Sequence, residues 1–194
     1  MARCIENRSQ RRPSVTIIGE GITEQFYFTH IRTILGYRYT IKPYYFSVTS
    51  LVEMDKKIVE SIQNGGYAIA VFDADVAKRN EIEKKKLDSI RKKYANKKTV
   101  ILCDSLTSIE YWFLLHYENT NRFFKDSAAT ETELKKHIPD YEKKKNFLQN
   151  AKWVIDLCAD GKLDIAKQRA TDFGVEGESY SNIFKAFELF EKIK

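Results

Sequence analysis

A chain of 194 residues, 43% hydrophobic and 13% aromatic, can bury the core of one domain, which excludes wholesale disorder. No apolar run approaches the roughly 20 residues of a membrane-spanning helix, and the polar, basic start lacks the apolar segment of a secretion signal. The formal charge of +6 allows a polyanionic partner, and three widely spaced cysteines without a CxxC pair argue against disulfides or zinc and for a cytoplasmic location.

Strands and helices alternate over the first 120 residues. Four apolar or β-branched runs predict strands, at residues 15–18, 41–48, 67–72 and 99–103. Helical spacing predicts helices over residues 23–34, 51–63, 78–95 and 107–116. Pro43 places the second strand at an edge, Thr23 is a plausible N-cap, Gly36 ends the first helix, and Thr107 and Glu110 have capping-box spacing. This order predicts an α/β fold with a mostly parallel, four-stranded, Rossmann-like sheet flanked by helices.

The last third of the chain shows helical patterns only. We expect helices there over residues 131–137, 141–159, 163–171 and 181–193. The whole chain is therefore expected to form a single domain. Its three parts are a flexible basic N-terminus (1–13), the α/β core (14–120) and a helical extension packed on that core (121–194).

Two pairs of carboxylates follow two of the predicted strands. Asp73 and Asp75 close the strand at 67–72, and alternation along a strand would place them on one face. Glu20 follows the first strand and Glu24 lies in the first helical turn. Carboxyl ends of parallel strands share one sheet edge, so the four acids should converge where ligands bind in α/β folds. Without His or Cys among them, they favour Mg²⁺ or Mn²⁺ over zinc.

Structural roles stay open for the same acids. Asp is common in turns, where it bonds its own backbone, and a first-turn Glu is favourable beside the helix dipole. The Gly19-Glu20-Gly21 turn is an incomplete dinucleotide fingerprint. Glu20 also stands where a pyrophosphate would bind, so nucleotide-cofactor binding is disfavoured.

The segment 78–98 is strongly basic, with ten Lys or Arg residues against three Asp or Glu. A basic face on one element favours a nucleic-acid partner, although a solvated helix face with pairs such as Glu81 and Lys85 is the alternative. The residues expected to contact nucleic acid are Lys84, Lys85, Arg91 and Lys92. With an acidic cluster nearby, the chemistry suggested is metal-assisted cleavage of a phosphodiester.

Several short motifs follow one another across almost the whole chain. They are Glu20-Gly21-x-Thr23-Glu24 with Tyr27-Phe28, Phe72-Asp73-Ala74-Asp75, Ser105-x-x-x-x-Glu110-x-Trp112-x-Leu114-Leu115-His116, Tyr141-x-Lys143 and the stretch 179–182. In this order and spacing the chain resembles a Toprim domain and, more narrowly, the RloB-like (AbiLii-like) branch of the Toprim superfamily. It departs at Thr107-Ser108, where that family is expected to carry a Pro.

The resemblance implies a Mg²⁺-dependent nuclease of antiphage defence (abortive infection), paired with an ABC-type ATPase. It also implies roles for individual residues. Glu20 is a metal ligand or general base, and Asp73 and Asp75 are metal ligands. Glu24 is a candidate ligand for a second metal, Glu110 assists, and Lys143 neutralises the phosphate or the transition state, with Lys144 and Lys145 as alternatives to it.

Other functions stay open at this point. A non-catalytic nucleic-acid- or partner-binding module on the same scaffold predicts salt-sensitive binding without turnover. A glycosyltransferase also uses Asp-x-Asp to hold a metal, but Glu20 alone supports it earlier in the chain. A phosphatase of the Asp-x-Asp-x-Thr type is disfavoured because residue 77 is Ala. DNA or RNA as substrate and a homo-oligomer are equally open.

Overall fold

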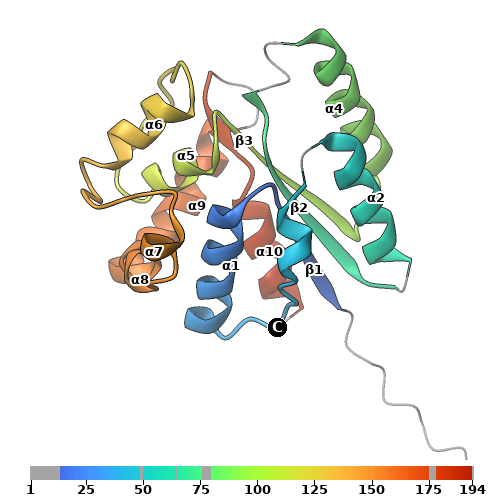
Figure 1. Cartoon of the computed structure of the whole chain (residues 1–194), viewed down its shortest axis with the longest axis horizontal. Helices are drawn as coiled ribbons and strands as arrows, with labels where there is room; N and C mark the ends of the chain where they lie inside the picture. Colours follow the sequence, from blue (N-terminus) through green and yellow to red (C-terminus); the bar gives the residue numbers. More distant parts are fainter. Residues whose placement is uncertain (1–13, 49, 64, 76–79, 175–177, 194) are drawn as a thin grey trace, which may run out of the picture.

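The computed structural model describes residues 14–48, 50–63, 65–75, 80–174 and 178–193, without the side chain at position 43. It has a four-stranded sheet in the order β1-β2-β3-β4, in which β1, β2 and β3 are parallel and β4 is antiparallel to β3. Helices lie on both sides of the sheet (Figure 1). The predicted α/β fold with a mostly parallel, helix-flanked sheet is therefore confirmed.

The N-terminal part of the chain contains β1 (Val15–Ile18), α1 (Ile22–Leu35), η1 (Pro43–Phe46), α2 (Leu51–Ile62), β2 (Tyr67–Asp73), α4 (Glu81–Tyr94) and β3 (Val100–Leu106). The C-terminal part contains α5 (Ile109–Leu114), α6 (Ser127–Leu134), α7 (Lys145–Leu148), α8 (Lys152–Cys158), η2 (Ala159–Gly161), α9 (Lys162–Phe173), β4 (Tyr180–Ser181) and α10 (Phe184–Lys192). None of the helices in the described part of the chain is long and apolar enough to cross a membrane.

The two faces of the sheet are covered by different helices. α2 and α4 pack together over one face, and α1 and α10 lie on the other (Figure 1). Strand β3 shows the alternation: Asp104 points to Arg91 on α4, whereas the neighbouring Cys103 lies against Ala186 on α10. β2, in the middle of the parallel pairs, is almost continuously buried, as expected for a strand covered on both sides.

The predicted edge strand at 41–48 is wrong. Residues 43–46 form the 3₁₀ helix η1, with Pro43 at its first position, where no backbone donor is required. The parallel contact with β1 is limited to an isolated bridge between Thr16 and Thr40. The segment instead crosses the carboxyl end of β1, where the backbone N–H of Gly19 donates to the carbonyl of Tyr45 at 2.9 Å.

The fourth strand comes from a region in which only helices were predicted. β4 is two residues long and pairs Ser181 with Ser105 and Tyr180 with Leu106. The predicted helix at 181–193 starts at Phe184, after that strand. The predicted helix at 141–159 is also wrong as a single element, because α7 and α8 are separate, and the predicted helix at 131–137 lies earlier, at 127–134.

A buried aromatic cluster fixes α1 against α5. The indole N–H of Trp112 donates to the hydroxyl of Tyr27 at 2.7 Å, and the Tyr27 ring packs against Phe113 and Trp153. All four side chains are buried. Because α1 and α5 both begin at the carboxyl edge of the sheet, this packing holds their first turns, and the acids they carry, close to that edge.

Candidate active site

Two acids come from the turn between β1 and α1. Glu24 is buried, and its carboxylate accepts a hydrogen bond from the backbone N–H of Gly21 at 3.0 Å, closing the start of the helix. Gly21 is therefore the N-cap, and the predicted cap at Thr23 is wrong. A Cβ at Gly19 would lie 2.8 Å from the Phe46 ring, so glycine is needed for this close approach. Glu20, between the two glycines, is exposed.

Asp73 lies at the end of β2, and its side chain contacts the start of α5. Its carboxylate accepts a hydrogen bond from the backbone N–H of Ile109 at 3.1 Å, at the start of α5. Asp75 lies just beyond the strand, so strand alternation does not by itself place it beside Asp73. Its charge nevertheless reaches the carboxylate of Glu20, which puts acids from both strand ends at the same edge.

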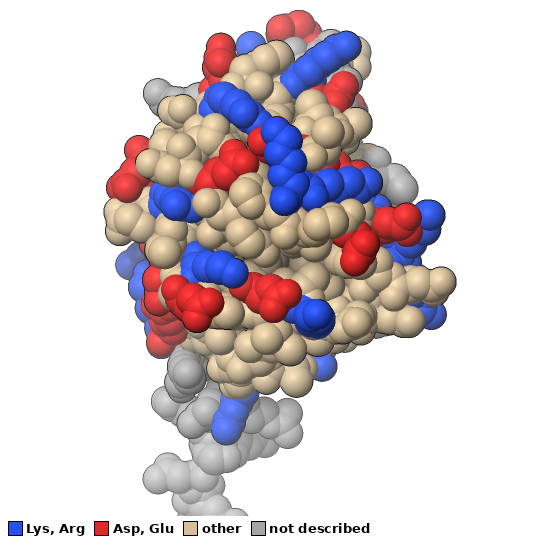
Figure 2. All heavy atoms as spheres, turned by 90° about the vertical axis from the view of Figure 1, so that its left-hand side faces the viewer, with Lys and Arg blue, Asp and Glu red and all other residues tan. Residues whose placement is uncertain are grey.

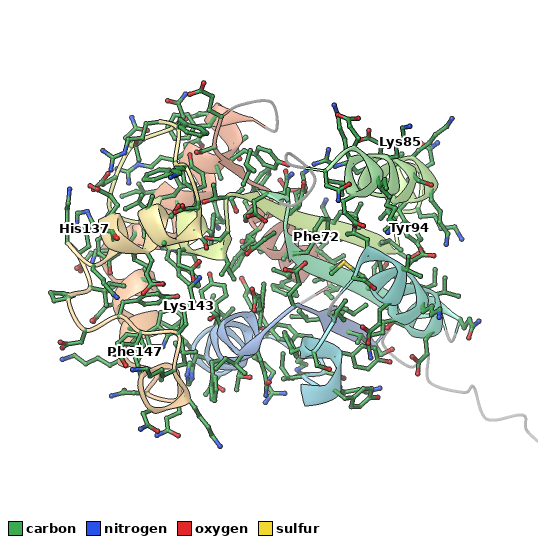
Figure 3. The ribbon with its side chains drawn as sticks, turned by 45° about the horizontal axis from the view of Figure 1, so that its top comes forward. Phe72, Lys85, Tyr94, His137, Lys143 and Phe147 are labelled. Atoms are coloured by element: carbon green, nitrogen blue, oxygen red, sulfur yellow. The ribbon has the colours of Figure 1, made fainter. Side chains whose placement is uncertain are left out.

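Glu110 is completely buried beside these acids and is satisfied by three side chains. Its carboxylate accepts hydrogen bonds from the hydroxyls of Ser108 at 2.6 Å and Tyr141 at 2.7 Å, and it pairs with the ammonium group of Lys143 at 3.0 Å. The predicted capping box is therefore wrong: Thr107 bonds the hydroxyl of Thr130 instead. Figure 3 shows Lys143 on the loop before α7, on the side of the molecule opposite α4.

The acids perturb one another. Although the Glu20 side chain is exposed, the surrounding protein partly desolvates its carboxylate, and this desolvation, together with the charge of neighbouring Glu24, raises its pKa to about 7, against a hydrogen bond from the backbone of Asp73. Burial and Glu110 raise the pKa of Glu24 to about 7 as well. Burial together with Glu24, Glu20 and Glu110 holds the pKa of Asp73 well above its usual range, and Lys143 opposes the shift. Partial burial lowers the pKa of Lys143, but its pairing with Glu110 outweighs this and raises the pKa above the ordinary value, which keeps the ammonium group charged.

The acid cluster suits a divalent cation because of the chemistry of its donor atoms. Among the described residues, no group of three or more His, Cys, Asp or Glu side chains is arranged to hold a metal ion. Mg²⁺ does not require one, because it usually keeps several waters and takes one or two carboxylates together with substrate phosphates. Crowded carboxylates with raised pKa values, held without His or Cys, are the environment that a hard cation relieves.

The predicted nucleic-acid contacts lie on α4, away from this cluster. Lys84, Lys85 and Lys92 are exposed on that helix, and Figure 3 shows Lys85 across the molecule from Lys143. Arg91 differs from them, because its guanidinium pairs with the buried carboxylate of Asp104 and donates a hydrogen bond to the Tyr180 hydroxyl at 2.8 Å. Arg91 therefore joins α4 to the sheet.

Sequence reasoning missed the buried carboxylate of Asp104. Besides Arg91, it accepts hydrogen bonds from the Tyr180 hydroxyl at 2.9 Å and the Asn182 amide at 2.8 Å, so it anchors β4 to β3. The signal available was an Asp at the end of an apolar strand run, which resembles the acids of the site. Ser108 was also missed as a donor to Glu110, and nothing in its spacing indicates that contact.

These features define an α/β protein with a cluster of coupled acids and one lysine at the carboxyl edge of its parallel strands. A model of the RloB-like protein family matches residues 15–186. The chain belongs to this family. No match was found among curated proteins or among solved structures.

Proposed function

We propose that this protein is a Mg²⁺- or Mn²⁺-dependent nuclease of Toprim type, which cleaves a phosphodiester bond in DNA or RNA. The observation that carries the proposal is the convergence of Glu20, Glu24 and Asp73, in which the charge of Glu24 raises the pKa of Glu20 and the charges of both glutamates raise the pKa of Asp73. Their position at the carboxyl ends of β1 and β2 is the ligand-binding edge of an α/β sheet. Perturbed carboxylates at such an edge are typical of functional sites.

In this proposal Glu20, Asp73 and Asp75 hold the cation, with Glu24 as a further ligand. The cation, when bound, would polarise the phosphate and lower the pKa of a water molecule. Glu20 is a ligand or, alternatively, the general base; as a base that does not ligate the cation, its carboxylate, with a pKa of about 7, is suited to accept a proton from an attacking water near neutral pH. Its exposure leaves it accessible to solvent and substrate.

Lys143 provides the positive charge in this scheme. Its ammonium group remains protonated beside Glu110, and 39% of its side chain is exposed, so it can also reach a phosphate oxygen. Glu110, fixed by Ser108 and Tyr141, orients the lysine rather than contacting substrate. A preorganised cation of this kind stabilises the charge that develops on the phosphate as the bond breaks.

The test is cleavage of DNA and tRNA by the purified protein with Mg²⁺ or Mn²⁺. Asp73→Asn and Glu20→Gln should each lower the cleavage rate by about 100-fold or more, the typical contribution of acid–base and metal-binding groups. Glu142→Gln is the matched control, because Glu142 is exposed and pairs with Lys144 outside the cluster. Cleavage that persists in both site variants, or in EDTA, contradicts the proposal.

A second candidate is a non-catalytic nucleic-acid- or partner-binding module on the same scaffold. It is favoured by the lack, among the described side chains, of a ready three-ligand metal set. It predicts salt-sensitive binding that EDTA leaves unchanged and no turnover of any substrate. The cleavage assay with and without chelator separates the two functions.

We also propose a biological role for the protein. A role in antiphage defence and abortive infection, with an ABC-type ATPase as partner, rests on the family resemblance. A cytoplasmic location is supported by Cys103 and Cys158, which are free thiols, as expected in a reducing compartment.

A further inference from the structure

A cavity of about 460 Å³ lies among α7, α8 and the turn that follows α6. Its volume is within the range of small-molecule sites. Aromatic side chains form part of its wall, among them Tyr117, His137, Phe147 and Trp153. None of these residues belongs to the acid cluster, so the proposed chemistry leaves the cavity unexplained.

Two pairs of aromatic rings pack against each other at the cavity. The rings of Tyr117 and His137 are stacked, with centroids 4.8 Å apart and planes within 4° of parallel. His137 is held in place by Glu118, 2.8 Å from its Nε2 atom. On another side of the cavity, half-buried Phe147 packs against buried Trp153, with ring centroids 6.1 Å apart. The Tyr117 ring is already covered by His137 and by the ammonium group of Lys162, 5.2 Å from its centroid, so a planar group would stack on the partly exposed rings of His137 or Phe147.

Polar groups at the cavity are available for hydrogen bonding. Asp140, Asn146 and Asp156 line it and are exposed. Within the described part of the chain, the side chains of Asp140 and Asn146 have no hydrogen bond or ion pair. Lys152 also lines the cavity, so the charge of the lining is mixed, as it is over this face of the molecule (Figure 2). The carboxylates of Asp140 and Asp156 favour a ligand that presents N–H donors, while an amide can donate as well as accept.

The cavity lies next to the proposed cleavage site along the chain. Lys143 contacts the acid cluster through Glu110, and Asn146 and Phe147 line the cavity only three and four residues later. Four residues span at most about 14 Å even when extended. The intervening Lys144 and Lys145 are exposed, so a polyanion could follow this segment from one site to the other.

We propose that the cavity binds one unpaired nucleobase of the nucleic-acid substrate, next to the scissile phosphate, and that it prefers guanine. This inference rests on the proposed nuclease function. Unpaired bases are recognised by stacking on aromatic side chains and by hydrogen bonds to their Watson–Crick edge. Guanine presents adjacent N–H donors on that edge, which suit a carboxylate, and an acceptor, which suits the amide of Asn146. The sugar and phosphate would stay outside, along the lysine segment.

The test measures binding of GMP, AMP, CMP and UMP to the full chain in EDTA by titration calorimetry. GMP is expected to bind most tightly, and Asp140→Asn and Asn146→Ala are each expected to weaken it about tenfold, the effect of one lost hydrogen bond to a charged or polar group. Gln149→Ala and Asp88→Asn are matched controls, because both residues are exposed and lie outside the cavity lining. The site variants are surface changes and should fold, which circular dichroism verifies.

The outcomes separate the base site from the proposed nuclease. Absence of GMP binding, or binding that Asp140→Asn and Asn146→Ala leave unchanged, overturns the cavity assignment even if the protein cleaves nucleic acid. Equal affinity for the four nucleotides overturns the guanine preference. Selective GMP binding that both variants weaken supports the assignment, and it does so in EDTA, where metal-dependent cleavage cannot contribute.

Discussion

The ammonium group of Lys143 lies 3.0 Å from the carboxylate of Glu110, a side chain with no exposed surface. The Lys143 side chain is 39% exposed, so this ion pair connects a fully buried carboxylate to the molecular surface. Lys143 also acts to lower the raised pKa of Asp73. The Asp73 carboxylate accepts a hydrogen bond from the backbone N–H of Ile109, the residue before Glu110 on α5. One cation therefore compensates charge on two acids from different elements.

Replacing Lys143 should destabilise the fold through Glu110. In Lys143→Ala the buried carboxylate keeps its hydroxyl donors but loses its counterion, and the expected loss of unfolding free energy is about 1–2 kcal/mol, reduced from the cost for a fully buried pair because Lys143 is partly exposed. Lys144→Ala, which breaks an exposed pair with Glu142, should change it by less than about 0.5 kcal/mol. Urea denaturation checks both, and equal losses would contradict this view of the pair.

Replacing Asp104 should lower the free energy of unfolding strongly. In Asp104→Ala, Arg91, Tyr180 and Asn182 lose their shared acceptor, and we expect a loss of about 3 kcal/mol. Thermal or urea unfolding measures the loss. Asp88→Ala, on the exposed side of α4, is the control and should stay within about 0.5 kcal/mol of the wild type. A wild-type value for the Asp104 variant would exclude its anchoring role.

The basic residues of α4 should separate into two groups. If α4 contacts a nucleic-acid backbone, replacing Lys85 and Lys92 together by Gln should lower the slope of log affinity against log salt by about 2 for a duplex ligand. Arg91→Gln should instead lower the unfolding free energy, because Arg91 pairs with Asp104. Fluorescence anisotropy over a salt series and urea denaturation measure the two effects. An unchanged slope in the double variant would remove α4 from the binding surface.

Local sequence patterns were sufficient to predict the strands that carry the candidate site and the end of the first helix. The runs ending before Glu20 and at Asp73 are short, apolar and β-branched, so they identify β1 and β2, and their parallel pairing brings their carboxyl ends to one edge. Gly36, with a positive φ of 68°, ends α1 as expected. Glu20, Glu24, Asp73 and Asp75 were selected from these strand ends and the helical turn that follows the first, whereas Glu110 came from the family resemblance. Their functional roles are predictions.

What could not be predicted depends on contacts distant in sequence. β4 is two residues long, too short for any periodicity, and exists because Tyr180 and Asn182 reach Asp104 more than 75 residues earlier. The segment at 41–48 has the residue types of a strand, but Pro43 starts a 3₁₀ turn and Phe46 packs on Gly19 instead. Tertiary packing overrode strand propensity there.

The pH dependence of stability should reflect the crowded acids. Glu24 has a pKa of about 7 in the folded protein against about 4.5 when unfolded, so between these values the folded state binds more protons and its stability falls as pH rises. By pH 8 the cost for this residue approaches about 3 kcal/mol. Glu24→Gln should flatten the decline in unfolding free energy from pH 5 to 8, measured by urea denaturation, whereas Glu142→Gln should not. An equal decline of the unfolding free energy with pH in both variants would contradict the assignment of this pH dependence to Glu24.

A divalent cation should reverse the same destabilisation. Mg²⁺ or Mn²⁺ binds carboxylates in their charged form, so protons compete with it, and the cation should stabilise the protein more at pH 8 than at pH 5.5. At ten times its dissociation constant the gain is about 1.4 kcal/mol. Thermal unfolding with MgCl₂ or MnCl₂, against NaCl of equal ionic strength, measures it. Asp73→Asn should lose most of this gain, since the variant removes a charge from the cluster that Glu20 and Glu24 share. Equal stabilisation of the variant and the wild type would place any bound cation away from β2 and leave the acid cluster without its proposed role.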